Sequence, residues 1–525
     1  MPTPALLPKP ALLPQPTAVT WTNATLTLDA HATISASDPD AAIARRLLIP
    51  ATGLALASAE RGTIAIIRDE RMPAEGYQLE VTPERVIITA ADSRGVNWAV
   101  QTLRQLIGPD AFLPGPVGDA WEVPTVSIID SPRFGWRAGH LDVGRHFMPV
   151  RDVLAHIDLL AMHKFNVFHF HLTEDQGWRF ESKKYPRLTE VAAWRPETVN
   201  AYLGSDGTPH GGFYTQDQLR HVVAYAAERG ITVVPEVEFP GHLTAVIAAY
   251  PELGVPGVPT PSVATGFGIL TDVLNMSDAA MEFVFDVYAE VLDVFPSRWI
   301  HIGGDEVPRD QWRDSPEMSA RAAELGLDSV EQLQDWFTAR LHAWLTERGR
   351  VAIGWDEVAD NGPVPGMILH AWRGSEKGVA AAHGMDVIMA PVGWTYFDYY
   401  QSTRTDEPYC IGSLTTTEKA YSFEPLDGFT PESAPRVLGV SFQLWSEYLP
   451  TRSAVEYMAW PRACATSEVA WSDPKGRSFE EFSTRLDAHL GRLAALGVNY
   501  RPETGPLPWQ TGGTGLRRRP EKQAW

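Results

Sequence analysis

The topology of the chain is indicated most clearly by TVVPEVE (232–238), followed by DAAMEFVFDVYAEVLDVF (278–295) and WIHIGGD (299–305). The first and last of these are short apolar runs of the kind that form buried strands, and the segment between them has the apolar spacing of a helix. A strand, a helix and a second strand in this order predict two parallel strands joined by a crossover helix.

The same order continues on both sides of this stretch. Eight apolar runs occur: RAGHLDV (137–143), NVFHFHL (166–172), TVVPEVE, WIHIGGD, VAIGW (351–355), MILHAW (367–372), DVIMAP (386–391) and VLGVSFQLW (437–445). Eight strands close a (β/α)₈ TIM barrel. An open doubly wound sheet is the alternative, but no Gly-rich phosphate fingerprint follows the first run. We therefore predict an α/β fold with a barrel catalytic domain over residues 131–510.

The first quarter of the chain has a different pattern. Residues 19–130 combine β-rich runs with two helix-like stretches, AAIARRLL (41–48) and NWAVQTLRQLI (97–107), which predicts a small α+β domain before the barrel. The Pro and Gly density of LPGPVGDAWEVP (113–124) indicates a linker, and we place the boundary near residue 130. We expect a Pro-rich flexible leader over residues 1–18 and a flexible tail over residues 511–525.

Composition limits the classes of function. The net charge of −21 disfavours a nucleic-acid or anionic-membrane surface. No apolar run reaches the roughly 18 residues of a membrane span. Cys410 and Cys464, the two cysteines, provide neither a disulfide framework nor a zinc-binding pattern. The N-terminal residues lack a charged segment and have prolines in every apolar stretch, so we predict no secretory signal and a cytoplasmic location.

Polar and aromatic residues stand where the predicted strands end. Catalytic side chains of a (β/α)₈ barrel lie at the C-terminal ends of its strands, so these residues are the candidates for function. They are Asp142, Arg145, His171, Glu174, Asp175, Glu236, Glu238, His242, Asp305, Glu306, Trp355, Asp356, Glu357, Trp372, Trp394, Tyr396, Asp398, Trp445 and Glu447. The indoles among them can stack on sugar rings, and the carboxylates and Arg145 can bind hydroxyls.

The sharpest element is HIGGDE (301–306). Its two glycines let the backbone pass close to another group, and two adjacent carboxylates follow. Like charges this close raise at least one pKa, as a general acid near neutral pH requires, so Glu306 is the predicted acid and base. Sequence neighbours do not easily straddle a sugar ring, so we expect Asp305 to orient a substrate group that itself attacks. An acidic loop or helix N-cap is the structural alternative.

The histidines suggest a different class of enzyme. His169 and His171 point to one side of a strand, and with His242, His301 and Asp305 they could form the site of a metal-dependent barrel hydrolase. Those enzymes carry their HxH on the first barrel strand, whereas here it falls on the second. We therefore predict a structural role for His169 and His171, and neither metal nor cofactor.

Eight motifs, in a fixed order along the chain, are similar to those of a known family. They are PRFGWRAGHLDVGRHF (132–147), FNVFHFHLTEDQGWR (165–179), PEVEFPGH (235–242), HIGGDE (301–306), GWDE (354–357), AWRG (371–374), WTYFDYYQ (394–401) and WSE (445–447). From about residue 15 to 500 the chain resembles glycoside hydrolase family 20, the β-N-acetylhexosaminidases, in its bacterial two-domain form. The resemblance implies removal of terminal β-linked N-acetylglucosamine or N-acetylgalactosamine with retention, through attack of the substrate's acetamido oxygen on C1 and an oxazolinium intermediate.

The resemblance also implies roles for single residues. Glu306 matches the general acid/base, Asp305 the carboxylate that holds the acetamido N–H, and Tyr396 the donor to the acetamido oxygen. The residues that match substrate-binding positions are Trp355, Trp372 and Trp445 as walls, Arg145, Asp398 and Glu447 as hydroxyl ligands, Asp175 and His242 as support for the catalytic pair, and Trp394 on the leaving-group side.

The chain departs from the family pattern at two acids. Glu174 and Glu238 stand where many relatives have Asp, so the charge is kept but the geometry around His242 and Asp305 is expected to change. The segments Tyr202–Phe213 and Ser402–Pro435 are long enough to shape the leaving-group side. A catalytically silent sugar-binding protein is the remaining alternative, although binding alone needs no proton donor.

Overall fold

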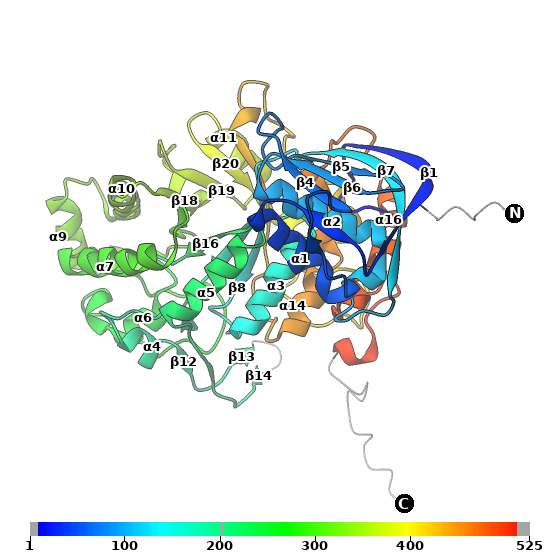
Figure 1. Ribbon diagram of the computed structural model, residues 1–525. Coiled ribbons are helices and arrows are strands. Elements are labelled where there is room, and N and C mark those ends of the chain that lie inside the picture. Colours follow the sequence, from blue (N-terminus) through cyan, green and yellow to red (C-terminus); the bar gives the residue numbers. More distant parts are fainter. Residues whose placement is uncertain (1–8, 201–203, 512–525) are drawn as a thin grey trace, which may run out of the picture.

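The computed structural model describes residues 9–200 and 204–511, and its larger part is a closed barrel of eight parallel strands (Figure 1). The strands follow the eight predicted runs: β8 (Trp136–Asp142), β9 (Val167–His171), β16 (Thr232–Glu236), β17 (Trp299–His301), β18 (Val351–Trp355), β19 (Ile368–Ala371), β20 (Asp386–Met389) and β21 (Val437–Phe442). Strand β21 pairs with β8 and closes the barrel, which confirms the predicted fold.

Helices connect most of the consecutive barrel strands. These helices are α3 (Val150–Met162), α5 (Gln216–Ala227), α7 (Asp278–Val294), α10 (Leu333–Glu347) and α11 (Ser375–Ala381). In the described chain the connection from β18 to β19 has only a short 3-10 helix, η4 (Asp356–Ala359). After β21 come α14 (Arg452–Ala459), α15 (Arg462–Trp471) and α16 (Phe479–Ala495). The starts of α5 and α7 are capped by the side chains of Thr215 and Ser277, which satisfy N–H groups that the first turn leaves free.

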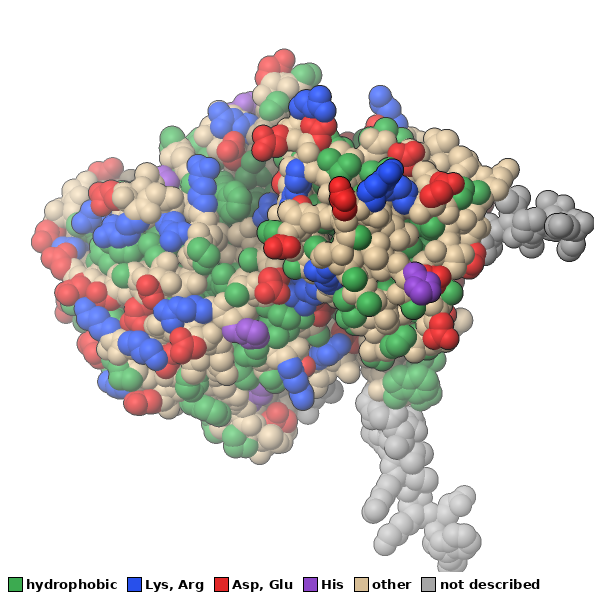
Figure 2. Space-filling view, in the orientation of Figure 1, with side chains coloured by type: hydrophobic (Ala, Val, Ile, Leu, Met, Phe, Trp, Pro, Cys, Tyr) green, Lys and Arg blue, Asp and Glu red, His purple; other side chains and the backbone are tan. Residues whose placement is uncertain are grey.

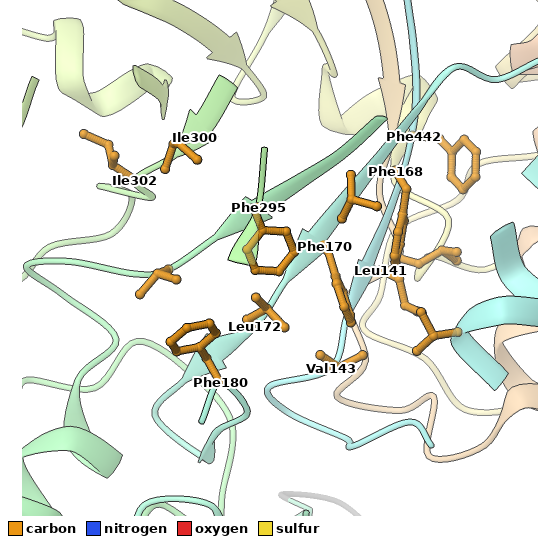
Figure 3. Close-up of a cluster of buried hydrophobic side chains, with 14 of the residues drawn as sticks. Leu141, Val143, Phe168, Phe170, Leu172, Phe180, Phe295, Ile300, Ile302 and Phe442 are labelled. Atoms are coloured by element: carbon orange, nitrogen blue, oxygen red, sulfur yellow. The ribbon is translucent and has the colours of Figure 1, made fainter. Parts of the chain in front are cut away.

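Both faces of the barrel strands are buried, as their continuous apolar runs predict. On the outside, Leu141, Phe168, Phe170 and Phe442 belong to the core cluster shared with the surrounding helices (Figure 3). Inside, side chains alternate with these and form layers. One layer is apolar: Trp136, Ala138, Val167, Val234, Ile353, Ile368 and Ile388. The next layer toward the C-terminal ends of the strands is polar: His140, His169, Glu236, His301 and His370.

The N-terminal domain is a seven-stranded mixed sheet with two helices (Figure 1). Its strands, in the order β1-β7-β5-β6-β4-β2-β3, are β1 (Ala18–Asp29), β7 (Ala120–Asp130), β5 (Tyr77–Val81), β6 (Val86–Ala90), β4 (Ile64–Arg68), β2 (Thr33–Ser35) and β3 (Ala57–Ser58). Helix α2 (Ser93–Ile107) packs on β5, β6 and β7, and α1 (Asp38–Thr52) packs beside α2. Both helices and the mixed sheet agree with the predicted α+β domain.

The leader and the linker differ from the sequence predictions. In the described part of the leader, Leu12 and Leu13 are buried, and Leu13 donates its N–H to Gln105 Oε1 (2.9 Å). Prolines remove N–H donors but do not prevent neighbouring leucines from being buried, so this segment is ordered without regular structure. Strand β7 begins inside the predicted linker; Pro124 fits there because β5 pairs with β7 only from Val126 onward. Residues 1–8 and 512–525 lie outside the described residues.

Buried ion pairs join the two domains. Glu75 of the N-terminal domain accepts a hydrogen bond from Arg137 at the start of β8 (2.5 Å). Asp130 accepts from Lys164 (2.9 Å) and from the indole of Trp471 (2.9 Å), both in the barrel domain. These groups are nearly or fully buried, so each charge depends on its partner across the interface. The two domains therefore form one unit.

The surface carries charges of both signs. Figure 2 shows acidic and basic side chains interspersed over the visible face. In the described ranges, no helix has the length and apolar character that crossing a bilayer requires. The cytoplasmic location stays a prediction.

Candidate active site

A cavity of about 400 Å³ lies at the C-terminal ends of the barrel strands, within the size range of small-molecule sites. Nine of the residues that the sequence predicts for the site line it. They are Arg145, Asp305, Glu306, Trp355, Trp372, Tyr396, Asp398, Trp445 and Glu447. They follow or end β8, β17, β18, β19, β20 and β21, so six strands converge on one cavity.

The turn after β17 needs both of its glycines. Gly303 and Gly304 have φ values of 66° and 95°, in the left-handed region that favours glycine. A Cβ on Gly303 would lie 1.7 Å from Glu238 Oε2, and a Cβ on Gly304 would lie 2.8 Å from a methyl group of Val358. Glu306 also has a positive φ, 50°, which few residues other than glycine adopt. This compact turn carries the acidic pair to the cavity.

The electrostatics of the pair suit an acid beside a hydrogen-bond acceptor. Burial and the neighbouring charge of Asp305 raise the pKa of Glu306 above its ordinary value, so Glu306 keeps its proton to a higher pH. Asp305 Oδ1 is buried and has no hydrogen-bond partner within the described structure. Glu306 can therefore donate a proton while Asp305 accepts an N–H from a bound molecule.

His242 and Asp175 lie behind the acidic pair. His242 Nε2 lies 3.6 Å from Asp305 Oδ2 and 3.7 Å from Glu306 Oε2, and His242 Nδ1 lies 3.3 Å from Asp175 Oδ2. Asp175 also accepts the N–H of Thr244 (2.9 Å), which fixes its carboxylate. Burial alone would lower the pKa of His242, but Glu174 and these carboxylates raise it well above the ordinary value. A positively charged imidazole thus stands next to both members of the pair.

The two acids that depart from the family pattern lie around this imidazole. Glu174 Oε2 lies 3.2 Å from His242 Nδ1, while its Oε1 lies 2.9 Å from Arg145 Nη2 and 3.3 Å from His171 Nε2. Glu238 accepts the N–H of Gly304 (3.3 Å) on the catalytic turn. Burial and the charge of Asp305 raise the pKa of Glu238 well above its ordinary value. Both longer side chains contact the support of the catalytic pair.

The opposite side of the cavity has two carboxylates and a guanidinium. Arg145 Nε lies 3.5 Å from Glu447 Oε1, and its guanidinium lies 4.9 Å from the centroid of the Trp445 ring. Asp398 Oδ1 and Glu447 Oε2 are buried and lack hydrogen-bond partners in the part of the chain that the structure describes. Burial raises the pKa of both carboxyl groups, and Glu447 adds to the shift of Asp398. Such unpaired acceptors beside a fixed donor are suited to sugar hydroxyls.

Aromatic rings form the remaining wall. Trp355, Tyr396 and Trp445 form one buried cluster, with Trp372 packed against it. The rings of Trp372 and Tyr396 are nearly parallel, with centroids 6.1 Å apart. Trp372 donates its indole N–H to Glu357 (3.0 Å), whose pKa burial and Asp305 raise to about 8. These rings enclose an apolar recess next to the acidic pair.

Trp394, which the sequence assigns to the leaving-group side, does not line this cavity. Its ring stacks on Phe423, with centroids 5.8 Å apart, and in the described chain it is not part of the cavity lining. It lies in the short helix α12 (Val392–Thr395), whereas Tyr396 follows that helix and faces the cavity.

Six residues of the cavity are missing from the sequence prediction: four come from loops with no strand-end signal, whereas Tyr399 and Tyr448 directly follow the predicted residues Asp398 and Glu447. The six residues are Phe267, Gly268, Ile269, Tyr399, Ile411 and Tyr448. Ile411 lies in the segment 402–435 that the sequence assigns to the leaving-group side. The described part of the other segment, 204–213, does not line the cavity, and Tyr202 lies outside the described residues.

The HxH pair is bound to a carboxylate. His169 Nε2 and His171 Nδ1 lie 2.8 Å and 2.6 Å from Glu236 Oε2, inside the barrel. Burial lowers the pKa of His169 to about 4, whereas Glu236 and Glu174 overcome burial and raise that of His171 to about 10. The structural role of His169 and His171 stays a prediction.

Comparisons with known proteins match both domains. Residues 134–474 match the family described as "Glycosyl hydrolase family 20, catalytic domain", and residues 9–131 match "Glycosyl hydrolase family 20, domain 2". A beta-hexosaminidase of Porphyromonas gingivalis is 42% identical over 84% of this chain, and the chain spans 56% of that protein's length. A beta-hexosaminidase of Akkermansia muciniphila is 35% identical over 87% of this chain and 92% of its own length.

A solved structure agrees with these sequence matches. The exo beta-N-acetylglucosaminidase of Vibrio harveyi, in complex with N-acetylglucosamine, superposes with a TM-score of 0.84 at 32% identity. The match covers 95% of this chain and 80% of that one.

Proposed function

Because the chain belongs to glycosyl hydrolase family 20, we propose that it is a retaining exo-β-N-acetylhexosaminidase that uses its substrate's own amide as the nucleophile. The observation that carries the proposal is the geometry of the Asp305–Glu306 pair. The two carboxylates are adjacent on one turn, one has a raised pKa, and the other has an unpaired oxygen next to the aromatic recess.

In the proposed first step, protonated Glu306 gives its proton to the glycosidic oxygen while the bond from C1 to that oxygen breaks. The acetamido oxygen of the same sugar forms the new bond to C1, which yields a cyclic oxazolinium ion. Asp305 accepts the acetamido N–H and offsets the developing positive charge. Tyr396 donates its hydroxyl hydrogen to the acetamido oxygen and orients it for attack.

In the second step, Glu306 acts as a base. It takes a proton from water, the water oxygen attacks C1, and the bond between C1 and the acetamido oxygen breaks. Two inversions at C1 leave the product with the configuration of the substrate. Burial holds the pKa of Tyr396 well above its ordinary value, with Asp398 adding to the shift, so its hydroxyl stays a donor throughout.

The cavity supports removal of a single terminal sugar. Trp355, Trp372 and Trp445 would enclose the acetamido group, and Arg145, Asp398 and Glu447 would bind hydroxyls at the closed end. At the mouth, Ile269 and Ile411 are 60% and 44% exposed, and we place the leaving group against them. The natural leaving group is therefore expected to present an apolar face, as a second sugar ring does.

Cleavage of a chromogenic β-N-acetylglucosaminide tests the proposal. We expect turnover that EDTA does not change, a product first released as the β-anomer by NMR, and strong inhibition by a thiazoline mimic of the cyclic intermediate. Loss of turnover with EDTA would favour a metal hydrolase, and binding without turnover would favour a silent sugar-binding protein. A glycosyl ester trapped on an Asp or Glu of the chain would contradict substrate assistance.

A further inference from the structure

Glu236 is a buried carboxylate beneath the cavity that the proposed mechanism does not use. It ends β16 and is fully buried inside the barrel. Its Oε1 accepts the indole N–H of Trp355 (2.7 Å) and lies 2.8 Å from His301 Nδ1. Its Oε2 lies 2.6 Å from His171 Nδ1 and 2.8 Å from His169 Nε2. Burial would raise its pKa, but the histidines lower it well below the ordinary value, so it stays ionised.

One oxygen of Glu236 determines how Trp355 sits at the cavity. An indole N–H can only donate, and leaving it buried without an acceptor is costly. The ring of Trp355 stacks on His370, with centroids 4.3 Å apart and an angle of 17° between planes. Stacking fixes the plane of the ring, and the hydrogen bond to Glu236 fixes the orientation of the ring within that plane. The wall of the acetamido recess is thus held from below.

The other oxygen of Glu236 is connected, through His171 and Glu174, to the imidazole that supports the catalytic pair. His171 lies between two carboxylates, with Nδ1 2.6 Å from Glu236 and Nε2 3.3 Å from Glu174. Its raised pKa, about 10, keeps the imidazole positively charged, so it donates from Nδ1 to Glu236 and forms an ion pair with Glu174 on its other side. Glu174 in turn contacts Arg145 (2.9 Å) and His242 (3.2 Å). These ion pairs connect Glu236 to the imidazole of His242, which lies beside Asp305 and Glu306.

We propose that Glu236 is a positioning residue that couples the acetamido recess, through Trp355, to the catalytic pair, through His171 and Glu174. This inference rests on the proposed function. One buried carboxylate would thus hold the acetamido recess and the catalytic pair in fixed positions relative to each other. Glu236 itself touches neither the substrate nor the reacting atoms. The longer side chain of Glu174 completes the connection, because it reaches His171 with one oxygen and His242 with the other.

A neutral isostere would break the connection without creating a cavity. The amide of Glu236→Gln has one accepting oxygen and one NH₂ group. The two firm donors, the Trp355 indole and the His171 imidazolium, approach different oxygens of the native carboxylate. In the variant one of them must face the NH₂ group, so either the recess or the support of His242 loses its fixed geometry.

Glu75→Gln is the matched control. Glu75 is also a buried glutamate that accepts from an indole, Trp98 Nε1 (2.9 Å), and from a cation, Arg137 (2.5 Å), but it lies at the domain interface. Both variants remove one negative charge from a buried network of similar composition. A role in stability alone predicts the same functional outcome for both.

The experiment measures kcat, KM and the thiazoline inhibition constant for both variants, at a temperature where circular dichroism shows each to be folded. For Glu236→Gln we expect kcat/KM to fall and the inhibition constant to rise together, each on the order of 10- to 100-fold. For Glu75→Gln we expect both constants to match the wild type. Trp355→Phe removes the indole N–H. In the double variant we expect this change to add little to the effect of Glu236→Gln.

The outcomes separate the two levels of the proposal. Wild-type constants in Glu236→Gln, or full additivity with Trp355→Phe, would overturn the positioning role and leave the proposed function standing. If Glu236→Gln does not fold, wild-type thiazoline binding by Trp355→Phe would overturn it instead. A wild-type protein that neither cleaves the glycoside nor binds the thiazoline would remove both proposals.

Discussion

The buried carboxylates of the barrel mouth differ from those of the domain interface in one respect. At the interface, Glu75 accepts from Arg137, Trp98 and Asn166, and the oxygens of Asp130 are likewise paired. Among the described residues, the buried carboxylate oxygens without a hydrogen-bond partner all lie around the mouth. They belong to Glu238, Asp305, Asp398 and Glu447. Carboxylates whose oxygens are all paired thus build the interface, and we expect a ligand to bind at Asp305, Asp398 and Glu447, the three of these four acids that line the cavity.

Glu306→Gln should have the largest effect at the mouth. Without its proton donor we expect kcat to fall about 10²- to 10⁴-fold, most for leaving groups that depend on protonation, while the melting temperature stays close to that of the wild type. Kinetics on aryl glycosides of different leaving-group pKa measure this. Glu376→Gln, at an exposed acid in the first turn of α11, is the control. Undiminished turnover in Glu306→Gln would show that another group is the acid.

Glu75→Gln should have the opposite profile at the interface. Removing the carboxylate leaves Arg137 buried without its partner, so we expect the free energy of unfolding to fall by about 3–5 kcal/mol. Kinetic constants of the folded protein should not change. Urea unfolding measures the loss, and a drop in kcat equal to that of a mouth variant would contradict the distinction between the two regions.

Asp305→Asn tests the coupling within the pair. We expect kcat on acetamido substrates to fall about 10²- to 10³-fold, because the developing charge loses its carboxylate. The negative charge of Asp305 helps to raise the pKa of Glu306, so its removal lowers that pKa. Since the acid must be protonated, activity should then be lost at a lower pH than in the wild type. A pH profile of kcat/KM checks the direction, and an upward shift would refute the assignment.

The two networks should also differ in their response to alkali. The folded-state pKa of His171 is raised to about 10, so its contribution to stability is full below its unfolded pKa of about 6.5 and is lost as pH rises through about 10. Glu75 has a lowered pKa, so its contribution is present above about pH 4.5 and is lost in acid. Unfolding from pH 7 to 10 should therefore become less pH-dependent in His171→Gln and stay unchanged in Glu75→Gln.

The smallest effect is expected at the rim. Ile411→Ala should raise KM for a disaccharide about two- to fivefold and leave kcat for a small aryl glycoside unchanged, because a half-exposed side chain contributes little apolar area. Comparing the two substrates isolates the leaving-group side. An equal loss on both would place Ile411 against the first sugar.

The sequence predicted the barrel well because its signal is repeated and local. Each strand is buried on both faces, so each appears as an apolar run, and the polar strand ends directly predict the cavity. The role of Trp394 stays a prediction, because this residue lies in a short helix, where strand-end position no longer says which way a side chain points.

Other features depend on contacts that are distant in the sequence. Glu236 stands at a strand end like the site residues, yet it points into the lumen, where only the fold brings it to Trp355. Phe267 and Ile269 lie in a loop without regular structure, so no periodic pattern in the sequence indicates that they reach the cavity. The position of the leader also depends on residues distant in the sequence, since Gln15 donates its N–H to Glu468 and the carbonyl of Ala11 accepts from Arg492.

The segment that begins the described chain has a consequence for how the protein is made. The carbonyls of Ala11 and Leu12 accept hydrogen bonds from Arg492 and Arg485 of α16, and the first of these bonds joins residues 481 positions apart. During synthesis, these two hydrogen bonds can therefore form only after α16 has been made. A nascent chain stopped before α16 would lack both of these arginines, and the carbonyls of Ala11 and Leu12 would have to bind water instead.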